Sequence, residues 1–98
     1  MEQFVSNKDN VKEKDNEYLD WLEKNPKGFV VNNDPKQRKA YLILHHSTCY
    51  TINKSEKNKD KKWMEKYMKT CSNDLGELQA YFKKLFGGDL HKCSKCYR

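Results

Sequence analysis

Two short segments, far apart in the chain, each carry side chains that bind soft metal ions. LHHSTC contains His45, His46 and Cys49, and CSKC contains Cys93 and Cys96. Structural zinc sites use four nitrogen or sulfur ligands in a tetrahedron, and a short spacing lets one turn hold two of them. We therefore expect a single Zn²⁺ site, formed by His45, Cys49, Cys93 and Cys96, that ties the two segments together.

The neighbouring histidines are distinguished by strand geometry. The apolar run AYLILHH, residues 40–46, predicts a strand, and side chains on a strand alternate between its two faces. Only one of the two imidazoles can then lie beside Cys49. We favour His45 as the ligand, with His46 as the alternative and His91 as a third choice.

The positions of the cysteines do not favour a redox-active Cys-x2-Cys pair. A thioredoxin-like Cys-x2-Cys pair opens a helix, but only Tyr97 and Arg98 follow Cys96 in this chain. Cys71 stands alone at a predicted strand end, where a cysteine is usually a small buried hydrophobe. We expect Cys71 to belong to the core.

The composition indicates a domain that needs a cross-link. The chain has 98 residues, of which 36% are hydrophobic and 35% charged, and small apolar-poor domains are often stapled by a disulfide or a metal. No apolar run approaches the ~20 residues that span a bilayer, and no signal peptide is visible at the N-terminus. We expect a cytoplasmic protein without a membrane partner, in which cysteine pairs bind metal.

Hydrophobic periodicity predicts two helices. Apolar residues recur at helical spacing over residues 11–24, and Asn25-Pro26 ends that segment because proline disfavours helix in the residue before it. A second amphipathic helix covers residues 75–86. Asp74 is its expected N-cap, with Glu77 as the capping-box partner, and the Gly87-Gly88 pair is its stop signal.

Strand signals complete an α+β fold. We expect strands at residues 28–32, 40–46 and about 66–71, the first two joined as a hairpin through the polar turn 33–39. The expected fold class is a small antiparallel three-stranded sheet with an N-terminal helix and a second helix before the C-terminal zinc knuckle. Residues 1–10 are expected to be a flexible N-terminus and residues 11–98 a single zinc-binding domain.

The net charge of +6 is compatible with an anionic partner such as DNA or RNA. Basic residues gather in the predicted hairpin turn and in a polar loop, where they are either solvated or in contact with phosphates. Tyr50 and Trp63 could stack on a base or pack within the domain. The candidate nucleic-acid contacts are Lys36, Arg38, Lys39, Lys54, Lys57, Lys59, Lys61 and Lys62.

The order of these elements resembles the N-terminal zinc-binding domain of the bacterial Ada DNA-repair proteins. The matching pieces are GFVV, AYLILHHSTC, YMKTCSNDLGELQAYF and KCSKC, within residues 28–98. The resemblance places His45, Cys49, Cys93 and Cys96 on the four zinc-ligand positions of that family and implies a scaffold that lies on DNA. In that family the first ligand is a cysteine thiolate that accepts a methyl group. His45 takes its place here, so we do not expect this transfer.

The combined expectation is a zinc-finger-like nucleic-acid-binding module with structural zinc. The alternative is a structural zinc domain that binds a protein partner, as a regulator or an inhibitor from a mobile element. Four protein ligands leave no open position for a reactive water, and no paired carboxylates, nucleophile elbow or phosphate loop is visible. We therefore expect neither an enzyme nor a small-molecule substrate.

Overall fold

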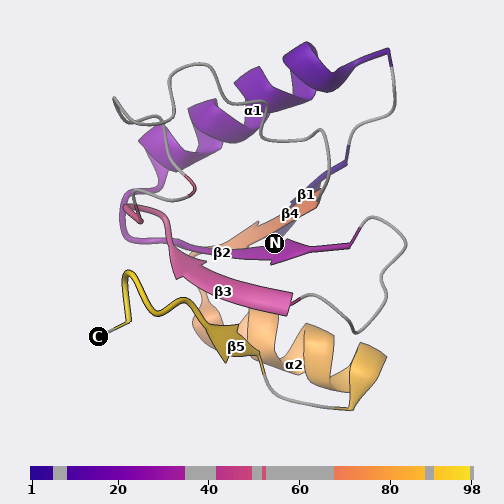
Figure 1. The fold of residues 1–98 in the computed structure, drawn as a ribbon, viewed down its shortest axis with the longest axis vertical. Helices are drawn as coiled ribbons and strands as arrows, with labels where there is room; N and C mark the ends of the chain where they lie inside the picture. The colour runs from indigo at the N-terminus through magenta and orange to yellow at the C-terminus, as the bar shows by residue number, and fades with distance from the viewer. Residues whose placement is uncertain (6–8, 35–41, 50–51, 53–67, 88–89, 98) are drawn as a thin grey trace.

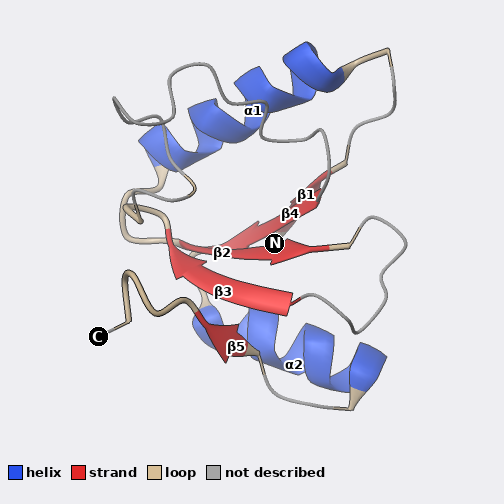
Figure 2. Ribbon diagram, viewed as in Figure 1, coloured by secondary structure: helices blue, strands red, loops and turns tan. Residues whose placement is uncertain are grey.

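The computed structural model describes residues 1–5, 9–34, 42–49, 52, 68–87 and 90–97. Within them the chain forms one five-stranded sheet between two helices (Figures 1 and 2). The class is α+β, as expected, but the sheet is larger than predicted and mixed. Its strands are β1 (Glu2–Phe4), β2 (Phe29–Asn33), β3 (Leu42–His46), β4 (Met68–Ser72) and β5 (His91–Lys92), and its helices are α1 (Val11–Lys24) and α2 (Leu75–Phe86).

The three predicted strands form the middle of this sheet. The strand order is β1-β4-β2-β3-β5, and β2 pairs antiparallel with both β3 and β4. The hairpin of β2 and β3 is therefore confirmed in its pairing; β2 runs on to Asn33, the first residue of the predicted turn, and residues 35–39 of that turn lie outside the described residues. Strand β2, and not β3, occupies the centre.

Both outer strands depart from the three-stranded prediction. Glu2–Phe4, expected in a flexible terminus, pair antiparallel with β4, and His91–Lys92 pair in parallel with β3. Strands of three and two residues are too short to show an alternating pattern. Their pairing is decided by contacts with segments far away along the chain.

The sheet buries a different side-chain set on each face because successive residues point in opposite directions. Val30 packs with Tyr18 and Leu22 of α1 on one face. Val31 packs with Leu78 and Phe82 of α2 on the other face. The two helices thus cover two separate apolar clusters, and the cysteines of the predicted zinc site pack in the cluster under α1.

Both helices have the predicted bounds. Asn25 ends α1, and its backbone N–H donates to the carbonyl of Leu22. Gly87 ends α2 in the left-handed conformation, with φ of 73°, which glycine adopts without a Cβ clash. Neither helix is long and apolar enough to cross a membrane, within the part of the chain that the structure describes.

The N-terminus of α2 satisfies its donors differently from the predicted capping box. The Asp74 carboxylate accepts the Glu77 backbone N–H at 3.2 Å, as expected. The reciprocal bond comes from Ser72, whose Oγ accepts the Asp74 N–H at 2.9 Å. The Glu77 carboxylate instead accepts a hydrogen bond from the Ser72 hydroxyl and pairs with the amino group of Met1. The cap thereby joins α2 to both β4 and the chain start.

Candidate metal centre

Strand β3 separates the two histidines as the alternation predicts. His45 lies on the face of the sheet that α1 covers and is 5% exposed. It forms one group of possible metal ligands with Cys49, Cys93 and Cys96. His46 points to the other face, where its ring stacks on Tyr97 with centroids 4.1 Å apart. It also contacts Phe29, at 5.5 Å between centroids. The imidazole that can reach a metal beside Cys49 is that of His45.

A tight turn after β3 brings Cys49 back beside His45. The Cys49 N–H donates to the His46 carbonyl at 2.9 Å, and the Ser47 N–H donates to the Gly28 carbonyl at the same distance. These bonds anchor the turn to β3 itself and to the residue before β2. Cys49 is 3% exposed as a result, so its thiol faces the protein and not the solvent.

The C-terminal segment carries the other two cysteines along the edge of β3. The Cys93 N–H donates to the Leu44 carbonyl at 2.9 Å, directly after β5, and the Tyr97 N–H closes a turn onto the Cys93 carbonyl at 3.0 Å. This turn places the Cys96 side chain beside the same face of the sheet. The segment is therefore a compact knuckle, residues 93–97, docked on β3.

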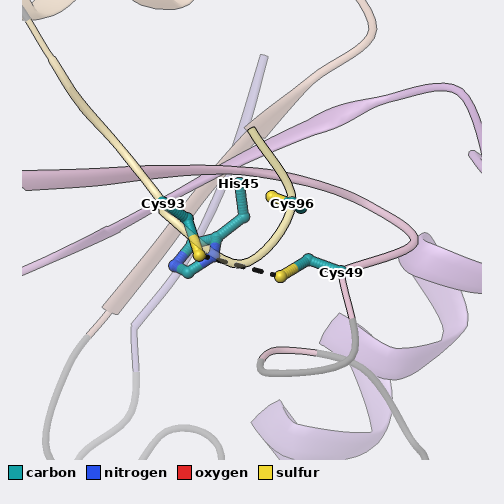
Figure 3. Close-up of side chains that lie close together, drawn as sticks. All are labelled: His45, Cys49, Cys93 and Cys96. Atoms are coloured by element: carbon teal, nitrogen blue, oxygen red, sulfur yellow. Dashed lines mark hydrogen bonds between the residues drawn. The ribbon is translucent and has the colours of Figure 1, made fainter. Parts of the chain in front are cut away.

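The four candidate ligand atoms converge on one point (Figure 3). The ligand atoms of His45, Cys49, Cys93 and Cys96 all lie within 4.8 Å of one another, and the two sulfurs of Cys49 and Cys93 are 3.9 Å apart. Thiolates about 2.3 Å from a tetrahedral zinc lie roughly 3.8 Å from each other. A disulfide would need about 2.05 Å, and all four cysteines are free thiols. The spacing fits ligands around an ion.

Backbone donors are directed at two of the sulfurs. The His46 N–H donates to Cys96 Sγ and the Lys95 N–H donates to Cys93 Sγ, each at 3.4 Å. Such bonds favour a thiolate, which is the form that binds metal. Without an ion the protonated thiol is favoured at Cys96, because burial raises its pKa to about 12. A cation at the centre would have to displace that proton.

The other cysteine and the third histidine lie away from this cluster. Cys71 is fully buried among the apolar residues under α1, as expected, and burial raises its pKa strongly. His91 is an exposed residue of β5 and is not part of the four-residue group. The geometry thus selects the four residues that the spacing indicated.

The predicted nucleic-acid contacts are not placed by the structure. They lie outside the described residues, as do Tyr50 and Trp63. The full set is Lys36, Arg38, Lys39, Lys54, Lys57, Lys59, Lys61 and Lys62.

Sequence reasoning missed the residues that support the ligands. The stacking of Tyr97 on His46 and the bond from His46 N–H to Cys96 Sγ join both cysteine-bearing segments independently of any ion. An aromatic residue directly after a Cys-x2-Cys pair was a usable signal. The parallel strand at His91–Lys92 had none, because two residues show no period.

No family model matches this chain, and no match was found among curated proteins or among solved structures. The functional argument therefore rests on the site itself.

Proposed function

We propose that the chain is a small zinc-binding module in which His45, Cys49, Cys93 and Cys96 hold one Zn²⁺. The observation that carries the proposal is the convergence of these four ligand atoms within 4.8 Å. Three thiols and one imidazole form a soft donor set, which in a tetrahedral arrangement favours zinc. The group contains no carboxylate, the ligand type that Mg²⁺ and Ca²⁺ require.

The role of the ion is structural in this proposal. Four protein ligands complete a tetrahedral zinc, so that no position remains for a water or a substrate. His45, Cys49 and Cys93 are each at most 8% exposed, which leaves little access from solvent. The ion would fasten the turn after β3 to the knuckle, and no enzymatic role is proposed. A reducing compartment such as the cytoplasm would keep the three thiols available.

We further propose that the module binds nucleic acid through its phosphate backbone. The net charge of +6 and the resemblance of the ligand order to DNA-repair zinc domains support this partner. Three exposed lysines of the described chain are close in sequence to the segments that form the candidate metal centre. Lys27 precedes β2, and Lys92 and Lys95 lie on either side of Cys93. Within the described residues none of these three forms an ion pair, unlike Lys14 and Lys24 of α1. Exposed ammonium groups without an ion pair remain available to phosphates, and that of Lys92 also lies over the Tyr97 ring, 5.6 Å from its centroid.

Fluorescence anisotropy with labelled DNA and RNA of mixed sequence, over a series of salt concentrations, tests this partner. Binding should weaken as salt rises, with a log–log slope of roughly −0.9 for each phosphate neutralised on duplex DNA. Lys92→Gln with Lys95→Gln should lower the slope by about one to two units. The matched pair Lys83→Gln with Lys84→Gln, in the last turn of α2, should change it less. No binding to either nucleic acid at low salt would remove this partner.

A protein partner is the second candidate, and an exposed apolar side chain favours it. Leu85 on α2 is 45% exposed, next to the half-buried Phe86. A single exposed leucine is common on monomers, so this observation is weaker than the charge argument. Zinc binding without nucleic-acid binding would make a protein partner the better account.

A further inference from the structure

The edge of strand β3 is covered by a segment that the metal centre fastens. Backbone groups of alternate residues on a strand point to the same side. The Leu44 carbonyl accepts the Cys93 N–H, and the His46 N–H donates to Cys96 Sγ. The Leu44 carbonyl and the His46 N–H are therefore directed at β5 and the knuckle, while Ile43 and His45 direct their backbone groups at β2. Every described bond across this edge ends on the segment 91–97.

The cover itself has little backbone pairing of its own. Strand β5 contributes two residue pairs, Ile43 with His91 and Leu44 with Lys92. Beyond it, Leu90 and Tyr97 are only partly buried against the cluster under α2. Two of the four candidate ligands, Cys93 and Cys96, sit in this cover, while His45 lies in β3 and Cys49 follows it. The ion would therefore strengthen a link that otherwise consists of a few backbone bonds and the stacking of Tyr97 on His46.

Strand β3 is poorly protected once uncovered. Leu42–His46, LILHH, contains no lysine, carboxylate or proline, the residues with which proteins usually blunt an exposed edge. The present outer edges are different: β1 and β5 have three and two residues and carry the charged Glu2 and Lys92. Removing the cover would replace a short charged edge by a longer apolar one.

The cluster under α2 does not involve the ligands, whereas Cys49 and Cys93 belong to the cluster under α1. The cluster of Val31, Leu42, Leu44, Leu78 and Phe82 contains no cysteine or histidine. Strand β3 keeps five paired positions with β2 in the antiparallel register. Loss of the ion can therefore release the knuckle from the edge of β3 while β3 itself stays paired with β2.

We propose that metal binding controls this edge, and that the metal-free chain pairs with a second copy of itself along β3. This inference rests on the proposed metal centre. An antiparallel pair of identical β3 strands is self-complementary around a twofold axis, and a strand without lysine, arginine or carboxylate meets none of these charges in its copy. Leu42 and Leu44 of both copies would extend one apolar layer across the new junction.

The first test follows the oligomeric state of the full chain, kept under reductant so that no disulfide forms. Metal content is measured first, on the zinc-loaded protein and after chelation. Sedimentation velocity should show a monomer with zinc at all concentrations. Without zinc it should show a mass that doubles as concentration rises, and added zinc should restore the monomer. A chain that releases its zinc and stays monomeric at high concentration overturns the inference alone, and a chain that never holds zinc overturns the proposed function as well.

Hydrogen exchange of wild-type protein locates the contact without a variant. In dilute metal-free chain the His46 amide should exchange more than about tenfold faster, while the His45 amide, directed at β2, stays protected. In concentrated metal-free chain the His46 amide should regain protection. Equal loss at both amides, or collapse of all secondary structure on chelation, would overturn the proposal because β3 must persist in the sheet.

A charge placed on the strand should block the pairing. Ile43→Lys puts an ammonium on the edge strand and should keep the metal-free chain monomeric. Leu85→Lys makes the same change on α2 and should leave self-association as in wild type. Circular dichroism of the zinc-loaded variants checks that each folds, and the exchange measurement above decides the matter if Ile43→Lys does not. Undiminished dimerisation of a folded Ile43→Lys chain contradicts the β3 edge as the contact.

Discussion

The sulfur atoms of Cys49 and Cys93 lie 3.9 Å apart although 44 positions separate the two residues along the chain. One follows β3 through a tight turn and the other follows β5, which is paired with that same strand. The parallel pairing of β3 and β5 is what brings the ends of both strands to one place. An ion held there would link two residues that are 44 positions apart in the chain.

Removal of one ligand should cost metal and stability together. Cys93→Ser should abolish stoichiometric zinc binding and lower the thermal midpoint, because the knuckle loses its metal cross-link to β3 while the β2–β3 pairing and the cluster under α2 hold the sheet together. Thermal unfolding with and without added zinc, followed by circular dichroism, measures both effects.

Cys71→Ala is the matched control for that variant. Cys71 is buried but lies outside the ligand group, so this change should keep one zinc per chain and lower stability by only about 1 kcal/mol. Equal loss of zinc in both variants would contradict the assignment of the ligands.

The two histidines should separate in the same assay. His45→Ala removes a ligand and should eliminate tight zinc binding. His46→Ala removes a ring that stacks on Tyr97, so it should retain stoichiometric zinc and lose about 0.5–1.5 kcal/mol of stability. Competition with a chromophoric chelator measures the affinity of each. Loss of zinc in His46→Ala alone would reverse the assignment.

Alkaline pH should destabilise the fold through buried acids. Burial raises the pKa of the Cys71 thiol and of the Tyr18 hydroxyl, so the folded chain keeps protons that the unfolded chain releases above about pH 8.5 for a thiol. Stability is then full below about pH 8.5 and falls above it by up to about 1.4 kcal/mol per pH unit for the Cys71 thiol, and the Tyr18 hydroxyl adds to this loss only above about pH 10.

Urea unfolding between pH 7 and 10 measures this slope, and Cys71→Ala should make it shallower. An unchanged slope in that variant would show that the Cys71 thiol is not responsible. Metal-loaded samples at fixed free zinc keep the ligand thiols out of the comparison.

Gly28 is expected to resist substitution because of its neighbours. A Cβ at this position would lie 2.6 Å from the Trp21 ring and 3.0 Å from both the Ser47 hydroxyl and the Asn73 side chain. Gly28→Ala should cost about 1–3 kcal/mol by overpacking and should also weaken zinc binding, because the Gly28 carbonyl anchors the turn before Cys49.

Gly76→Ala gives the comparison for Gly28→Ala. Gly76 lies in the first turn of α2, and its nearest contact would be 3.2 Å away on the Asp74 side chain. Alanine favours helix over glycine by up to about 1 kcal/mol, so this variant should be close to neutral or more stable. Denaturant midpoints of the two variants test the difference, and equal destabilisation would argue against steric crowding at Gly28.

The sequence predicted the parts of the fold whose signal is local. The bounds of both helices follow from apolar spacing, from Asn25-Pro26 and from Gly87. Strand alternation predicted that only one of His45 and His46 lies beside Cys49, and the structure places His45 in the cysteine group and His46 against Tyr97. These features depend on residues a few positions apart, and propensity and period are informative at that range.

What the sequence did not predict depends on contacts between distant segments. Strands β1 and β5 exist because β4 and β3 offer open edges to them, and the helix cap recruits Ser72 where Glu77 was expected. Ligand chemistry predicted that Cys93 lies beside Cys49. The parallel pairing of β3 with β5, which brings the two residues together, was not predicted.

The most direct test of the metal centre is native mass spectrometry of the full chain with stoichiometric Zn²⁺, together with the visible spectrum after Co²⁺ replaces it. We predict one ion per chain, and for Co²⁺ the bands of a tetrahedral site with sulfur-to-metal charge transfer, both lost in Cys93→Ser and retained in Cys71→Ala. A folded chain that takes up no zinc, or a cobalt spectrum without sulfur ligation, would contradict it.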